Sequence, residues 1–258
     1  MDFTLKTYRT LLDSLLTQGF SFQAFRDFIR EPRERVIILR HDVDRLPGNS
    51  LTTARIEQAA GILGSYYFRI VPESYNELVI REISDLGHEI GYHYEDLTLA
   101  GGDVDKAYTS FCRNLEKISK LVPVTTICMR GSPLSKWDSR AIWEKYDYRA
   151  LGITAEPYFD IDFNKTFYLT DTGRRWDGHK VSIRDKAMAS SPVTNPDFLS
   201  RSYHATSHII AALEAGGFPN QVMLTLHPQR WTDNKLLWVQ EFIAQNLKNQ
   251  VKRWMVKK

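Results

Sequence analysis

Along most of the chain, short apolar runs alternate with longer segments in which apolar residues recur at helical spacing. The apolar runs predict buried strands, and they lie at 35–41, 65–70, 89–93, 125–130, 148–153, 166–169, 180–183 and 222–226. The helical stretches lie at 50–62, 75–86, 103–119, 138–145, 202–215 and 233–247. Fully apolar strands joined by helical crossovers predict a parallel sheet with both faces covered.

About seven or eight such units favour a (β/α) barrel, complete or incomplete, over an open sheet. Two amphipathic segments, 5–16 and 22–29, precede the first strand, and a proline at position 32 ends the second. We therefore predict an α/β protein in which residues 1–34 form a helical extension packed on a barrel of residues 35–258. The loosely patterned segment 156–195 is interpreted as an irregular rim and not as a second domain.

Composition narrows the choice of partners. The 34 Lys and Arg residues exceed the 31 Asp and Glu residues by only three, so no nucleic-acid surface is expected. The basic tail at 252–258 is interpreted as a solvated helix end. Cys112 and Cys128 lack metal-binding spacing and are expected to be free thiols. Neither a signal peptide nor an apolar run of about 20 residues occurs, so we predict no transmembrane segment and a cytoplasmic protein.

The first candidate site is the sequence Arg-His-Asp-Val-Asp at 40–44, directly after an apolar run. The carboxyl ends of barrel strands are where active sites form. Asp42 and Asp44 suit a pair in which one carboxylate holds a metal and the other acts as a base. The alternative is a salt-bridged turn in which Arg40 or Arg45 neutralises the aspartates.

Three further strand ends carry polar groups. His93 follows an apolar run and is a candidate metal ligand, whereas His88 lies at the opposite end of that strand and is expected to make a structural hydrogen bond. Arg130 can orient a carboxylate through its planar guanidinium. His227 is suited to act as a general acid.

Candidate substrate contacts lie in the segment 168–176, which follows a predicted strand. Trp176 could stack on a sugar ring, and Arg175 or Arg174 could bind an anionic group. Trp231 lies near another rim loop. The alternative is a rim loop with ordinary salt bridges.

These four strand-end segments, in this order, resemble the NodB-homology polysaccharide deacetylases, which form carbohydrate esterase family 4. The resemblance covers residues 35–247 and is closest to a divergent subgroup whose first motif reads RHDVD. It implies a distorted (β/α) barrel, a bound divalent metal with zinc preferred over other divalent ions, and removal of N- or O-acetyl groups from sugars.

The resemblance also implies residue roles. Asp42 looks like the catalytic base, Asp44 and His93 look like metal ligands, Arg130 looks like the arginine that tethers the base, and His227 looks like the general acid. In this chain Val43 separates the two aspartates, which the family usually has adjacent.

The family's second metal histidine would fall at position 97, which is Leu97 here. Glu95 and Asp96 are the nearest substitutes for that ligand, with His41 a weaker one. The predicted function is metal-dependent hydrolysis of an acyl group, N-acetyl above all, from a carbohydrate substrate.

The predicted location favours a nucleotide- or lipid-linked precursor of a surface polysaccharide as that substrate. The alternatives are a glycan-binding pseudoenzyme, suggested by Leu97, or a hydrolase of another small C–N amide. The sequence does not predict an oligomeric state.

Overall fold

The computed structural model describes residues 1–131, 135–177 and 195–256, with side chains up to residue 250 in the last range. Seven parallel strands form one sheet in the order β5-β4-β3-β2-β7-β6, with β1 also pairing with β2. The strands are β1 (Ser21–Gln23), β2 (Val36–Val43), β3 (Ser65–Phe68), β4 (Glu89–Tyr94), β5 (Val124–Met129), β6 (Phe167–Thr170) and β7 (Gln221–Leu226). The predicted α/β fold with about seven parallel strands is confirmed.

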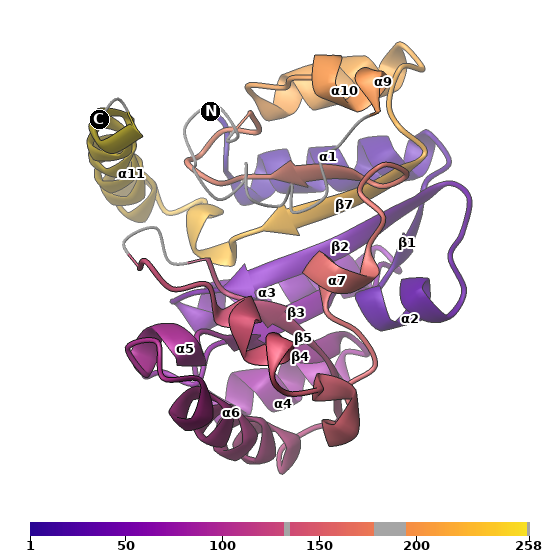
Figure 1. The fold of residues 1–258 in the computed structure, drawn as a ribbon. Coiled ribbons are helices and arrows are strands. Elements are labelled where there is room, and N and C mark those ends of the chain that lie inside the picture. The colour runs from indigo at the N-terminus through magenta and orange to yellow at the C-terminus, as the bar shows by residue number, and fades with distance from the viewer. Residues whose placement is uncertain (132–134, 178–194, 257–258) are drawn as a thin grey trace.

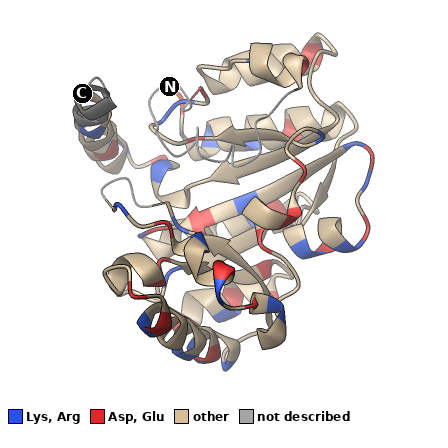
Figure 2. Cartoon of the chain, viewed as in Figure 1, with Lys and Arg blue, Asp and Glu red and all other residues tan. Residues whose placement is uncertain are grey.

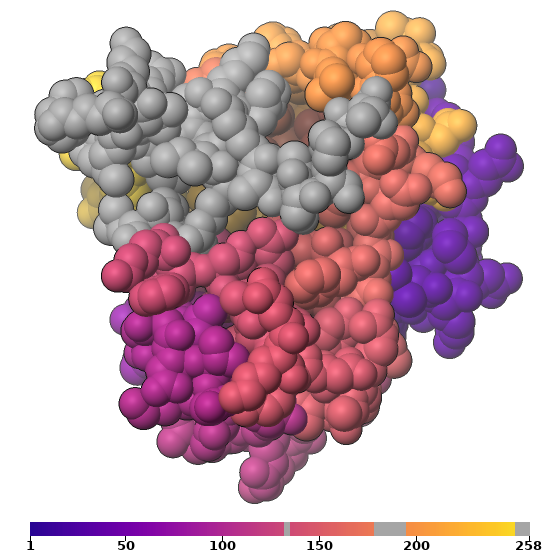
Figure 3. Space-filling view, viewed as in Figure 1, coloured from indigo at the N-terminus to yellow at the C-terminus, as the bar shows by residue number. Residues whose placement is uncertain are grey.

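Strand β2 lies at the centre of the sheet, and all eight of its residues are buried. Its first half pairs with β1 and its second half with β3, while β7 pairs along most of its length. Among the described residues, β5 and β6 end the sheet without pairing to one another, so the barrel is incomplete. A bridge between Thr126 and Ala155 extends the sheet beyond β5, and Figure 3 shows the segment 135–177 lying across the central and lower part of the front.

Helices cover both halves of the sheet (Figure 1). Helices α1 and α10 pack together beside β7 and β2, and α3, α4 and α6 lie on the half that contains β3 to β5. The α-helices are α1 (Leu5–Thr17), α2 (Phe25–Arg30), α3 (Pro47–Ala59), α4 (Glu77–Asp85), α5 (Asp96–Leu99), α6 (Val104–Ser119), α7 (Pro157–Asp160), α9 (Pro196–Ser200), α10 (Thr206–Glu214) and α11 (Lys235–Val256). The 3-10 helices of the described residues are η1 (Ser139–Glu144), η2 (Tyr148–Leu151) and η4 (Pro228–Arg230).

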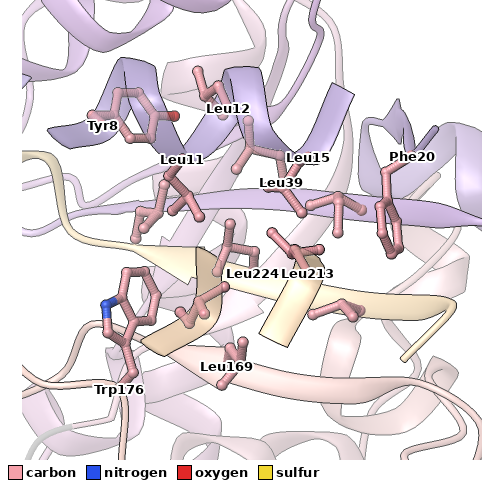
Figure 4. Packing of buried hydrophobic residues seen from close by; sticks show 14 of the residues in the cluster. Tyr8, Leu11, Leu12, Leu15, Phe20, Leu39, Leu169, Trp176, Leu213 and Leu224 are labelled. Atoms are coloured by element: carbon pink, nitrogen blue, oxygen red, sulfur yellow. The ribbon is translucent and has the colours of Figure 1, made fainter. Parts of the chain in front are cut away.

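The largest apolar cluster joins the N-terminal helix to the sheet (Figure 4). Leu11 and Leu15 of α1 pack with Leu39 of β2, Leu224 of β7 and Leu213 of α10. Burial of each such side chain stabilises the fold by about 1.5–3 kcal/mol. The division at residue 34 stays a prediction, and both β1 and α1 on its N-terminal side belong to the same sheet and core.

Two stretches differ from the predicted elements. The strand predicted at 148–153 is the 3-10 helix η2, in which Asp147 accepts a hydrogen bond from the backbone N–H of Arg149 at 2.8 Å and Gly152, at a φ of +79°, ends the turn. This local capping opposes the extended conformation that the apolar pattern predicted. Strand β1 overlaps the start of the segment 22–29, which is predicted as helical and in which α2 begins at Phe25. The strand predicted at 180–183 lies outside the described residues.

Candidate functional site

The candidate site lies at the carboxyl ends of the central strands. In a parallel sheet these ends share one edge, and here Asp42 of β2, His93 of β4, Cys128 of β5 and His227 after β7 approach it. The register pairs Asp42 with Tyr67 of β3 and His93 with Cys128, so these side chains point to the same side of the sheet. Figure 2 shows the charged positions near the tip of the β2 arrow.

Asp42 is buried and is held by Arg40, which precedes it by two residues on the same face of β2. The guanidinium donates from Nε to Oδ1 at 2.8 Å and from Nη2 to Oδ2 at 2.7 Å. Burial would raise the pKa of the Asp42 carboxyl, but Arg40, followed by His93 and His227, lowers it. Asp42 is therefore a carboxylate at neutral pH.

His93 presents its Nε2 atom to this carboxylate. Its Nδ1 lies 3.0 Å from the backbone oxygen of Cys128, which can only accept, so Nδ1 carries the proton. Its Nε2 lies 3.6 Å from Oδ2 of Asp42. Burial lowers the pKa of His93 despite the neighbouring carboxylates. A neutral imidazole with its second nitrogen fixed on a carbonyl is the state in which histidine binds metals.

Asp42, His93 and Cys128 could together hold a metal ion, because a carboxylate oxygen, an imidazole nitrogen and a thiol sulfur of these residues all lie within 4.8 Å of one another. Among the described residues we call these three the ligand group. Ligand atoms of a tetrahedral zinc site, with bonds of about 2.0–2.3 Å, lie roughly 3.3–3.8 Å apart, which matches the separation between Asp42 and His93. A carboxylate, an imidazole and a thiol also suit zinc chemically. Burial raises the pKa of the Cys128 thiol, which a bound metal would have to overcome. The residues present therefore fit a divalent metal.

The packing of β3, β4 and β5 next to this group depends on Gly91, two residues before His93. The ring of Tyr67 crosses over Gly91, and its hydroxyl lies 2.9 Å from Oγ1 of Thr126 on β5. A Cβ atom at position 91 would lie 2.3 Å from Cε1 of Tyr67 and 2.9 Å from the backbone oxygen of Thr126. The glycine of the His88–His93 motif is therefore required for close packing below the site.

Arg130 binds a different aspartate from the one expected. Its Nε donates to Oδ1 of Asp44 at 2.8 Å and its Nη1 to Oε2 of Glu95 at 2.7 Å. Oε1 of Glu95 accepts from Nε of Arg69 at 2.7 Å. The expectation that Arg130 orients Asp42 is corrected, because Arg40 fills that role.

Neither predicted acidic partner of His93 joins the ligand group. Neither Asp44 nor Glu95 has a carboxylate oxygen among the atoms that lie within 4.8 Å of one another, and Arg69 and Arg130 hold the Glu95 carboxylate elsewhere. Burial would raise the pKa of Asp44, but Arg130, followed by His227 and His93, lowers it far below its usual range. Cys128, and not Glu95, is the third residue near Asp42 and His93 that could contribute a ligand atom.

His227 is oriented by Asp171, which follows β6. Oδ1 of Asp171 lies 2.6 Å from Nδ1 of His227, and its Oδ2 accepts from the backbone N–H of His227 at 3.0 Å. Arg230 and Trp231 also donate to this carboxylate, at 2.6 and 2.8 Å. Burial opposes ionisation of Asp171, but Arg230 and then His227 lower its pKa to about 2. With Nδ1 facing this carboxylate, Nε2 of His227 is left for chemistry.

The sequence interpretation missed Asp171 and Cys128 as site residues. Asp171 stood in a segment interpreted as a sugar-binding loop, and its position directly after a predicted strand was the signal that could have identified it. Cys128 lies inside an apolar run, where a thiol resembles an ordinary core residue. Both cysteines are free thiols, as predicted.

His41 and His88 lie on the helix-facing side of the sheet, away from Asp42. His41 places Nε2 2.9 Å from Oε1 of Glu57, and its ring stacks on Tyr66 with centroids 4.1 Å apart. The backbone N–H of Gly64 donates to Nδ1 of His88 at 3.1 Å, which confirms the structural role predicted for His88. Strand alternation thus removes His41 as a substitute metal ligand.

The other substitute for the missing histidine is also engaged elsewhere. Asp96 accepts hydrogen bonds from Tyr92 and Ser110, both at 2.7 Å. Leu97 is buried in an apolar cluster with Ala107 and Ile142. Position 97 therefore contributes to the core and not to the ligand group.

The predicted sugar-stacking tryptophans are corrected by their burial. Trp176 is 3% exposed and Trp231 is 1% exposed, and both belong to the core cluster shown in part in Figure 4. Arg175 forms an ion pair with Asp177, with 2.7 Å between Nη2 and Oδ2. Such covered indoles cannot form an exposed platform, and the indole N–H of Trp231 instead positions Asp171.

The fold and the site together define a class: a parallel α/β protein with a carboxylate–imidazole–thiol group and an aspartate–histidine pair at the carboxyl ends of its strands. No family profile matches the sequence, and no curated protein gives a significant match. The chain is similar in structure, at low identity, to carbohydrate esterases of family 4, which is the family that its motifs resemble.

A family 4 carbohydrate esterase from Bacillus anthracis matches over 93% of this chain and 85% of its own, with 13% identity and a TM-score of 0.40. A CE4 esterase from Streptococcus mutans matches over 94% and 90%, with 14% identity and a TM-score of 0.43. A CE4 family pseudoenzyme from Bacillus anthracis matches over 85% and 63%, with 13% identity and a TM-score of 0.43. Likeness at this level says nothing about the reaction.

Proposed function

We propose that this protein is a metal-dependent hydrolase that removes an acyl group, N-acetyl above all, from an amino-sugar substrate. The observation that carries the proposal is that two groups of side chains lie at the same edge of the sheet, where the strands end. One is the ligand group of Asp42, His93 and Cys128, and the other is the His227–Asp171 pair. The first suits a divalent metal, and the second is a proton donor with a fixed tautomer.

The geometry supports an exchange of the two aspartate roles given by the resemblance. Asp42 lies in the ligand group, and we assign it to metal binding with His93 and Cys128. A bound divalent ion would polarise the acyl carbonyl and lower the pKa of a water molecule. Asp44 lies outside the group and is tethered through one oxygen to Arg130, so we assign it the role of taking the proton of the attacking water.

His227 completes the proposed chemistry as the proton donor to the leaving nitrogen. The carboxylate of Asp171 fixes Nδ1 of His227 and directs its Nε2 outward. His227 is one of the groups that lower the pKa of both Asp42 and Asp44, so the three side chains share one electrostatic environment. The leaving amine would then depart protonated.

Metal content separates the two aspartates. Asp42→Asn and Cys128→Ser should each reduce the divalent metal retained by the purified protein, measured by mass spectrometry of the eluted ions. Asp44→Asn should retain metal at the wild-type ratio. Asp27→Asn, which changes a surface aspartate of α2, is the control. Metal lost from Asp44→Asn and kept in Asp42→Asn would restore the original assignment of roles.

Acetate release from a panel of N-acetylated amino sugars and their nucleotide- and lipid-linked forms tests the reaction. Wild-type protein with zinc should release acetate from at least one member. Asp44→Asn and His227→Gln should each lower the rate by roughly 10²–10⁴-fold. Metal-loaded protein that releases no acyl group from any member would refute the proposal.

One observation favours a second function, glycan binding without turnover. Arg40 engages both oxygens of Asp42, and a guanidinium so placed supplies the positive charge that a metal would otherwise supply. Protein that binds sugars while excluding zinc and other divalent ions would support this alternative.

A further inference from the structure

Helix α11 is attached to the body of the protein through polar contacts. Glu241 forms an ion pair with Arg45, and Nδ2 of Asn249 donates to the backbone oxygen of Gly173 at 3.0 Å. The indole N–H of Trp238 donates to the backbone oxygen of Asp2 at 2.8 Å. These three residues lie on one face of the helix, so that face points toward the body.

The opposite face of α11 is apolar and exposed. Leu236, Ile243 and Leu247 follow one another at intervals of seven and four residues, which places them on one line along the helix. They are 67%, 53% and 60% exposed, and Val239 beside them is 45% exposed. Figure 1 shows α11 projecting from the rest of the fold. A surface helix of a globular protein shows the reverse arrangement, with its apolar face turned inward.

The charge of this part of the chain has one sign. After Glu241 the sequence contains five basic residues and no acidic one. A second copy of the chain docked on this face would bring two such positive segments together, which opposes self-association. A surface of anionic lipid headgroups complements both properties, because it attracts the basic residues and accepts the aliphatic side chains.

We propose that α11 is an interfacial helix that docks the protein on a bilayer containing anionic lipids. Leu236, Ile243 and Leu247 enter the boundary between headgroups and acyl chains, and the positive charge of the sequence after Glu241 attracts the anionic headgroups. Among the described helices, none is both long enough and apolar enough to cross a bilayer, so α11 lies along the surface. This inference is independent of the proposed hydrolysis.

The body-facing side of α11 contacts the edge of the candidate site. Arg45, which binds Glu241, directly follows Asp44, and Gly173, which binds Asn249, lies two residues after Asp171. The helix therefore joins the proposed docking face on its outer side to the site loops on its inner side.

Flotation with vesicles tests the proposal on the full chain. Wild-type protein should bind vesicles of phosphatidylcholine mixed with phosphatidylglycerol, and should bind pure phosphatidylcholine vesicles at least about tenfold more weakly. The variant L236Q/I243Q/L247Q should bind the mixed vesicles at least about a hundredfold more weakly than wild type. Because these side chains are exposed, its thermal unfolding should match that of wild type.

The matched control removes exposed leucines from other elements. L78Q/L199Q changes two side chains of comparable exposure, on α4 and α9, and should bind the mixed vesicles as wild type does. Equal loss of binding in both variants, or no binding by wild type, would overturn the proposal. A wild-type dimer in sedimentation equilibrium that L236Q/I243Q/L247Q abolishes would assign the face to a second copy and would also overturn it.

Discussion

The buried pair of Arg40 and Asp42 gives the sharpest stability prediction. Both side chains are buried, and two charge-assisted hydrogen bonds of 2.8 and 2.7 Å join them. In Arg40→Met the carboxylate would remain buried without its partner, with His93 neutral beside it. Breaking a buried pair in this way costs about 3–5 kcal/mol of unfolding free energy.

The cost should be much smaller when both partners are removed. Replacing a buried ion pair by apolar residues is often close to neutral, so Arg40→Met/Asp42→Leu should be at least about 2 kcal/mol more stable than the sum of the single variants predicts. Urea unfolding at pH 7, with a chelator present, measures all four proteins of this cycle. Arg30→Met, which breaks the exposed pair with Asp27, is the control and should cost at most about 1 kcal/mol.

Zinc provides an independent readout of the same pair. Without the guanidinium, the buried Asp42 carboxylate is stabilised by any cation that binds it. Added zinc should therefore raise the urea midpoint of unfolding more for Arg40→Met than for wild type. The double variant lacks the carboxylate and should show a smaller rise than Arg40→Met. Additivity of the single variants within about 0.5 kcal/mol would refute the reasoning.

Three further changes test other parts of the structure. Asp171→Asn should lower the free energy of unfolding by roughly 2 kcal/mol at pH 7, because the pKa of Asp171 is lowered from 3.8 to about 2 in the folded protein. This difference between variant and wild type should shrink as pH falls from 4 toward 2. A difference that stays constant in acid unfolding would contradict the prediction. Gly91→Ala should lower the free energy of unfolding by about 1–3 kcal/mol, measured in urea. Gly48→Ala is the control and should leave it nearly unchanged, because a Cβ at position 48 meets no atom within 4 Å. Equal losses in the two variants would contradict the packing argument. Burial raises the pKa of Glu156 from 4.5 to about 7, and the folded carboxyl keeps its proton while the unfolded one loses it. Wild-type stability relative to Glu156→Gln should therefore fall by up to about 3 kcal/mol between these pH values, and a constant or rising difference would show that the carboxyl ionises normally.

Much of the fold could be predicted because apolar patterning reports local burial. Strands β2 and β7 contain apolar runs that are followed by polar residues, and β2, β4 and β7 each lie within two residues of the predicted position. The short element η2 could not be predicted in the same way. Its apolar residues look like a strand, and only its capping by Asp147 decides otherwise.

The candidate site could be predicted in part for a related reason. Asp42, His93 and His227 stand where buried strands end, and such polar groups are costly unless they are used or paired. Which groups meet depends on register and on the face of the strand. Because of those features, Cys128 lies beside His93, and His41 points toward Glu57. Arg130 donates a hydrogen bond to Asp44 for the same reason.

The sequence by itself determined the parallel α/β architecture and the strand edge at which the polar groups gather, because both follow from the spacing of apolar residues. Only the tertiary structure decided which of these polar side chains bind one another, that Trp176 and Trp231 are buried, and that the apolar face of α11 points outward. The physical reason is that hydrogen bonds and ion pairs form over a few ångströms between segments far apart in the chain. Periodicity fixes the direction of a side chain relative to its own element and leaves open what that side chain will meet.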